Sequence, residues 1–196
     1  MSPSQLGAFV KSSANLELPD LQFHIQPLSL DAFGKPLHKF DALTASICNL
    51  NPESRGVVEI CSNNYKDAPN IKPNYLSTTK DRMIAAQSIR ITRNIMAQDA
   101  LKQYHPEEFS PGLDYETEED LIKAAGNIGS TIFHPVGTIQ MGPNDEPVDP
   151  RLRVRGIQGL RVVDASIMPT IISGNTNSPT LMIAEKASDM IKEDAN

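Results

Sequence analysis

The period of the hydrophobic pattern changes near residue 78, and the part before that point has the pattern of strands. Residues 21–26 alternate between apolar and polar side chains, which predicts a strand with one buried face and places His24 on the polar face. Residues 42–50 and 55–61 are two further strand-like runs, and the short turn-rich connection between them predicts a hairpin. An antiparallel sheet is the expected outcome.

Helical patterns follow the strands. A long helix is predicted over residues 79–100, with Thr78 or Thr79 as its cap and a wide apolar face that needs a sheet to cover. A short helix is predicted over residues 118–126, capped by Thr117, with acidic residues in its first turn as the helix macrodipole favours. Strands followed by helices indicate the α+β class, here an antiparallel sheet backed by helices.

The pattern changes again after these helices, so we expect residues 1–126 to form one domain and residues 127–196 to return to a different layer. The β-branched run 160–164 predicts a strand buried on both faces, and it follows the strand-like residues 152–154. We do not expect the 160–164 strand to join the sheet of the first domain.

A C-terminal helix is predicted over residues 179–192, because Pro179 suits the first turn of a helix and either Asn177 or Ser178 can cap it. The helical period gives this helix an apolar inner stripe and a charged outer face. The inner stripe is expected to consist of Ile183, Ala187 and Met190.

Composition excludes some classes of function. The net charge is -6 and the pI is about 5.2, which argues against a nucleic-acid partner because phosphate binding needs a basic surface. Cys48 and Cys61 lack the spacing of a zinc site, so we expect two reduced, half-buried thiols and no metal. The sequence shows neither a signal peptide nor a run long enough to span a bilayer, which favours a cytoplasmic or a peripheral protein.

Two features of the second part can carry chemistry. His134 stands between an apolar segment and a proline, and taken alone it is either a structural hydrogen-bonding residue or a general base. Residues 173–180 form a polar, glycine-containing turn that leads directly into a helix N-terminus. This turn is either an ordinary helix cap or a site where backbone N–H groups stabilise an anion.

Both features belong to a pattern that resembles the C-terminal signature of the glucose–methanol–choline (GMC) oxidoreductases. Five segments carry the resemblance, namely 134–142 (HPVGTIQMG), 148–154 (VDPRLRV), 159–169 (GLRVVDASIMP), 174–177 (GNTN) and 184–187 (AEKA). Residues 19–24, 55–58 and 73–77 are similar to the substrate-domain sheet of the same family. The resemblance implies oxidation of the CH–OH group of an alcohol to an aldehyde, with FAD as the hydride acceptor.

The resemblance also implies roles for individual residues. His134 lies at the position of the family's catalytic base, and an imidazole can accept a proton at neutral pH. Asn175 lies at the second position of the catalytic pair, where an amide can hydrogen-bond the substrate oxygen. The residues at positions that contact FAD in the family are Asp164, Ala165, Thr176 and Asn177.

The family's G-x-G-x-x-G fingerprint, which binds the FAD pyrophosphate, does not occur in this sequence. We therefore expect a truncated or split product whose partner is the missing N-terminal FAD-binding half, and which binds FAD poorly by itself. Without that half, residues 160–164 and 178–192 are expected to expose an apolar surface and to cause association or low solubility.

Three functions fit the resemblance. The first is an alcohol dehydrogenase or oxidase that is completed by the N-terminal half, the second is a non-catalytic remnant, and the third is a hydroxynitrile lyase on the same scaffold. Asn175 favours choline-like or simple primary alcohols as substrates. The low aromatic content of 5%, with no tryptophan, argues against choline itself because a quaternary ammonium needs an aromatic cage or a carboxylate.

Overall fold

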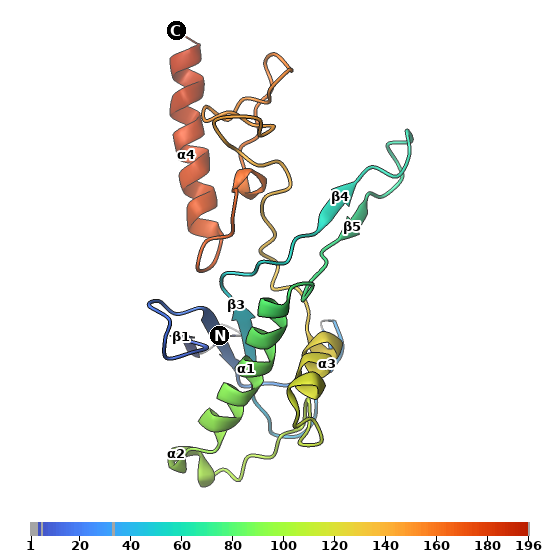
Figure 1. Ribbon diagram of the computed structural model, residues 1–196, viewed down its shortest axis with the longest axis vertical. Coiled ribbons are helices and arrows are strands. Elements are labelled where there is room, and N and C mark those ends of the chain that lie inside the picture. Colours follow the sequence, from blue (N-terminus) through green and yellow to red (C-terminus); the bar gives the residue numbers. More distant parts are fainter. Residues whose placement is uncertain (1–3, 5, 33, 196) are drawn as a thin grey trace. The chain divides into compact units, whose positions relative to one another are not determined.

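The structure is a computed structural model that describes residues 4, 6–32 and 34–195. The chain forms two compact units (Figure 1). Unit 1 contains the described residues up to Ser54 and Leu76–Ser130, and unit 2 contains Arg55–Tyr75 and the described residues from Thr131 onward. Residues 55–75 thus belong to the second unit, although the sequence grouped them with residues 1–126. The functional roles given to the two domains stay predictions.

Antiparallel strands and helices make up the chain, so the α+β class is confirmed. The strands are β1 (Leu6–Val10), β2 (Leu21–Gln26), β3 (Thr44–Asn49), β4 (Val57–Glu59) and β5 (Asn70–Lys72). The helices are α1 (Thr79–Met96), α2 (Asp99–Lys102), α3 (Glu118–Ile128), the short 3-10 helix η1 (Ala165–Ile167) and α4 (Asn177–Asp194).

The sheet of unit 1 has the order β1-β2-β3, and all its pairs are antiparallel. The predicted hairpin between residues 42–50 and 55–61 is wrong, because β3 pairs with β2 whereas β4 pairs with β5 in unit 2. The physical reason lies in the connection between them. Asp81 of α1 accepts hydrogen bonds from the backbone amides of Glu53 and Ser54, which holds this connection on the helix.

One face of the unit 1 sheet packs against α1, as the alternation of β2 predicted. Leu21 and Phe23 of β2 form a buried cluster with Ile84 of α1. The opposite face is polar, yet Gln22 is buried and His24 is half-buried, so this face is less exposed than a solvent-facing strand surface. The sheet therefore buries side chains on both faces.

The helices of unit 1 begin where the sequence predicted. The Thr78 side chain accepts a hydrogen bond from the Asp81 amide, and the Thr117 side chain accepts one from the Asp120 amide. The end of α1 differs from the prediction, because the helix stops at Met96 and a turn separates it from α2. α3 packs against α1 through a small cluster that contains Leu121, Ala86 and Ile89.

The predicted strands at 152–154 and 160–164 are wrong. In the described ranges these residues make only isolated bridges, between Val148 and Val154 and between Arg153 and Arg161. Leu160 is 45% exposed, so this segment is not buried on both faces. A strand is buried on both faces only if other elements of the fold cover those faces, and the pattern of side chains within the strand does not reveal whether such elements are present.

The core of unit 2 lies between α4 and the irregular segment that precedes it. Its buried residues are Val148, Leu152, Ile167, Met168, Ile183 and Ala187. Ile183 and Ala187 are buried and Met190 packs beside them, which confirms the predicted inner stripe of α4. Leu160 is exposed, as are Leu181, Met182 and Ile191 of α4, in keeping with the expected apolar surface. Association in solution stays a prediction.

Candidate functional site

The segment that carries His134 lies alongside η1 in unit 2. The amide of Ile139 donates to the carbonyl of Ser166 at 3.1 Å, and the amide of Met141 donates to the carbonyl of Ile167 at 2.8 Å. These bonds fix the backbone a few residues after His134. The imidazole itself is half-buried.

His134 contacts two side chains from the turn that precedes α4. Its Nδ1 lies 2.9 Å from Thr176 Oγ1, and its Nε2 lies 2.9 Å from Asn175 Nδ2. Thr176 is buried at 9% exposure, whereas Asn175 is exposed. The structure thus brings together the two residues of the predicted catalytic pair and one residue that was predicted to contact FAD.

Asp164 and Ala165 lie at the start of η1. The Asp164 side chain accepts a hydrogen bond from the Ser166 amide at 2.8 Å, and the hydrogen bonds from Ser166 lower the pKa of its carboxyl. In the described part of the chain, neither Asp164 nor Ala165 hydrogen-bonds to His134. Ala165 packs against the core that η1 shares with α4.

The N-terminus of α4 begins at Asn177, and Thr176 is its N-cap residue. The predicted caps, Asn177 and Ser178, are therefore one and two residues too late. The backbone N–H groups of Asn177 and Ser178 belong to the first turn, where the positive end of the helix dipole lies. This helix end can stabilise negative charge on a neighbouring group.

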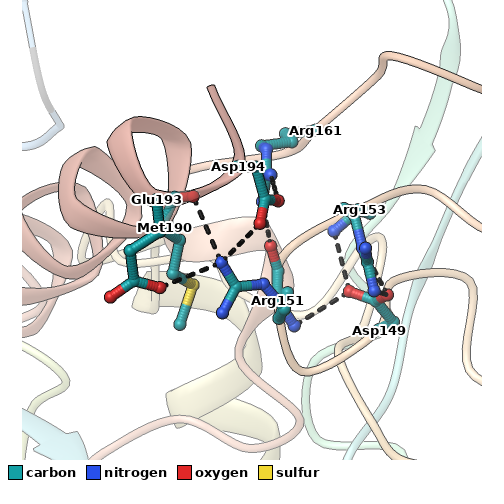
Figure 2. Close-up of polar contacts among 7 residues, drawn as sticks. All are labelled: Asp149, Arg151, Arg153, Arg161, Met190, Glu193 and Asp194. Carbon is teal, nitrogen blue, oxygen red and sulfur yellow. Dashed lines mark hydrogen bonds and ion pairs between the residues drawn. The ribbon is translucent and has the colours of Figure 1, made fainter. Parts of the chain in front are cut away.

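The C-terminal end of α4 is held by an arginine cluster that the sequence analysis missed (Figure 2). Arg151 donates to the Met190 carbonyl at 3.2 Å, to Glu193 at 3.1 Å and to Asp194 at 2.7 Å. Arg161 donates to Asp194 as well, and this bond holds the pKa of Asp194 below its usual range. The sequence contains a signal for this cluster, because several closely spaced arginines at 151–161 could neutralise the acidic residues 193–194 at the end of the last helix.

Other candidate sites lack support among the residues that the structure describes. Those residues contain no group of three or more His, Cys, Asp or Glu side chains placed to hold a metal ion. Cys48 is half-buried and Cys61 is exposed, and burial raises the pKa of the Cys48 thiol. None of the helices described is both long and apolar enough to cross a membrane.

Curated relatives match almost the whole chain. It is 44% identical to an oxygen-dependent choline dehydrogenase of Proteus mirabilis (strain HI4320), over 96% of this chain and 34% of that relative. It is 41% identical to an alcohol dehydrogenase [acceptor] of Pseudomonas putida, again over 96% of this chain and 34% of the relative. The chain therefore spans about a third of the length of the curated relatives that it matches.

Solved structures agree with the sequence matches. Pyridoxine 4-oxidase from Mesorbium loti superposes with a TM-score of 0.87 at 26% identity, over 97% of this chain and 38% of that one. Formate oxidase from Aspergillus oryzae RIB40, in a study of FAD modification, gives a TM-score of 0.80 at 28% identity, over 91% of this chain and 32% of that one. Residues 52–184 match the sequence model of a family described as GMC oxidoreductase. The chain belongs to the GMC oxidoreductase family.

Proposed function

We propose that this chain supplies the catalytic pair and the substrate part of an FAD-dependent alcohol oxidoreductase. The observation that supports this most directly is the contact between His134 Nε2 and Asn175 Nδ2 at 2.9 Å. The names of the relatives, choline dehydrogenase and alcohol dehydrogenase, and the FAD named with a similar structure, point in the same direction.

In this proposal His134 is the general base. Its Nε2 accepts the hydroxyl proton of the alcohol, while the amide of Asn175 hydrogen-bonds the oxygen that loses this proton. A bound FAD would supply the acceptor for the hydride from the carbon that carries this oxygen, so that the alcohol becomes an aldehyde. An exposed Asn175 beside a half-buried imidazole leaves Nε2 on the side that a substrate can reach.

The electrostatics at the N-terminus of α4 suit a flavin. The first-turn N–H groups and the macrodipole favour negative charge, which a flavin gains when it is reduced. We propose that Thr176 and Asn177 face the flavin ring side, and that Asp164 and Ala165 lie against the rest of FAD. The partner in this proposal is a separate FAD-binding part, supplied in the same chain or in a second one.

A small primary alcohol is the proposed substrate class. The relatives include both a choline dehydrogenase and an alcohol dehydrogenase, so the family match alone does not choose between these substrates. The few aromatic residues of this chain favour the simple alcohol, because aromatic rings would otherwise hold a quaternary ammonium.

The test measures flavin reduction by an alcohol in the protein assembled with its FAD-binding part. His134→Ala should lower the rate by about 10²–10⁴, the usual contribution of a positioned general base. Asn175→Ala should slow flavin reduction less. It should raise the activation free energy by roughly 1–3 kcal/mol, because it removes one hydrogen bond to the reacting oxygen. His105→Ala, at an exposed histidine of unit 1, is the matched control. A near-normal rate of flavin reduction in the His134→Ala variant would refute the proposal.

A further inference from the structure

We propose that Thr176 is a positioning residue that decides which ring nitrogen of His134 carries the proton. Its hydroxyl oxygen lies 2.9 Å from His134 Nδ1, on the opposite side of the ring from Asn175. The consequence for catalysis rests on the function proposed above, but the proton position is a property of this chain alone.

The arrangement of donors determines the tautomer. Asn175 presents its amide nitrogen to His134 Nε2, and an amide nitrogen can donate a hydrogen bond but not accept one. Nε2 must therefore accept, which places the ring proton on Nδ1. The Nδ1–H group then donates to Thr176 Oγ1. The buried side of the ring keeps its proton, and the lone pair of Nε2 faces the exposed Asn175.

Two features leave the Thr176 hydroxyl available for this role, namely its helical backbone, where Thr78 and Thr117 are extended, and the proline at the third position of α4. An N-cap threonine normally accepts a hydrogen bond from an amide of the first turn. Thr78 accepts from Asp81 at 3.2 Å and Thr117 accepts from Asp120 at 3.1 Å, and in both cases the donor is the third residue of the helix. In α4 the third residue is Pro179, which has no N–H group.

The same geometry suits a base that works repeatedly. When an alcohol binds, its hydroxyl group takes the place of the Asn175 amide at the Nε2 lone pair, and Nε2 then accepts the hydroxyl proton while the Nδ1–H bond to Thr176 is kept, so the ring does not have to turn. Nδ1 lies against the buried Thr176 side chain. Thr176 thus acts on the proton transfer through His134.

The test reads the ring protons of His134 directly by nuclear magnetic resonance. The chain is labelled with ¹⁵N in its histidines, and long-range nitrogen–proton correlations are recorded at about pH 9, where an ordinary imidazole is neutral. His134→Gln identifies the signals of His134 among the four histidines of the sequence. Wild type is expected to show the Nδ1–H form as the main tautomer.

Two variants of Thr176 separate hydrogen bonding from shape. Thr176→Val keeps the shape and removes the acceptor, and it should shift the tautomer ratio by about tenfold, the equivalent of one ordinary hydrogen bond. Thr176→Ser keeps the acceptor and should preserve the wild-type ratio. An Nε2–H form in wild type, or an unchanged ratio in Thr176→Val, would overturn the proposal.

Pro179→Ala is the second, independent variant. It gives α4 a third-residue amide that competes for the Thr176 hydroxyl, so the ratio should move toward that of Thr176→Val. An unchanged ratio in Pro179→Ala would contradict the role given to Pro179. None of these measurements needs FAD or turnover. If His134→Ala leaves flavin reduction intact, the proposed function fails and the tautomer result still stands.

Discussion

Replacing Asp81 by asparagine would keep the shape of a buried side chain and remove its charge. Asp81 is 3% exposed, and its carboxylate accepts the backbone amides of Glu53 at 3.0 Å and Ser54 at 2.7 Å. The Ser54 hydroxyl and the side-chain amide of Asn49 donate to the same carboxylate. These bonds hold the connection after β3 on the first turn of α1.

The cost of the substitution follows from the number of donors. The single oxygen of the new amide can replace one carboxylate oxygen. The NH₂ group takes the place of the other and must face the amide and the hydroxyl of Ser54, which are donors as well. A buried N–H left without an acceptor costs about 1–3 kcal/mol, and the remaining bonds lose the strength that a charged acceptor gives them. We expect Asp81→Asn to lower the free energy of unfolding of unit 1 by about 3 kcal/mol.

The effect should depend on pH. Burial alone would raise the pKa of Asp81, but the hydrogen bonds from Ser54 and Glu53 outweigh it and hold the pKa below its usual range. The ionised carboxylate therefore stabilises the folded state above the unfolded pKa of about 3.9, and this stabilisation is lost as the pH falls through the lower folded pKa. The difference between wild type and Asp81→Asn should shrink over that acid range.

Hydrogen exchange of the α1 amides is the suitable assay, because it reports on unit 1 without assuming that both units unfold together. Asp99→Asn is the matched control, since it removes the same charge from a side chain that is 93% exposed and that pairs with Lys102 at the surface. A loss below about 1 kcal/mol at neutral pH, or a difference that persists unchanged into acid, would show that the carboxylate network does not hold this connection.

Two further predictions concern other backbone anchors. Gly56→Ala should open the β4–β5 hairpin, because a Cβ there would lie 2.2 Å from the Lys72 carbonyl oxygen, and faster amide exchange in β5 would show it. Arg93→Met should loosen residues 103–116 and cost roughly 1–3 kcal/mol, because the Arg93 guanidinium donates to Glu108 at 2.8 Å and to two carbonyls of this segment. Unchanged proteolysis of residues 103–116 would contradict the second prediction.

The features that sequence reasoning predicted correctly depend on residues close together in the chain. The Thr117 cap needs only the amide three residues ahead, and the α4 stripe needs only the helical period. The alternation of β2 likewise predicted its packing against a helix. Each of these patterns can be recognised from neighbouring residues, although the partner of the β2 face, Ile84, lies far along the chain.

The features that failed depend on partners far away in the sequence. β3 and β4 do not pair because a carboxylate 27 residues beyond Ser54 holds the intervening connection. β1 was missed because its apolar run LGAFV lacks the alternation of a half-buried strand, and four of its five residues are exposed. The prediction of a strand at 160–164 assumed neighbours that a pattern of β-branched residues cannot guarantee.

At the candidate site, a predicted helix start that is one or two residues too late conceals the role of Thr176. His134 and Asn175 were identified through a resemblance, but their 2.9 Å contact joins residues 41 positions apart and no spacing rule predicts it. The sequence predicted Asn177 or Ser178 as the cap of the last helix, and either cap would make Pro179 the second or the first residue of that helix. With Thr176 as the cap, Pro179 becomes the third residue, and its missing N–H leaves the threonine hydroxyl to the histidine. The spacing of Thr176 and Pro179 is present in the sequence, but its meaning depends on the residue at which α4 begins, and the structure supplies that residue.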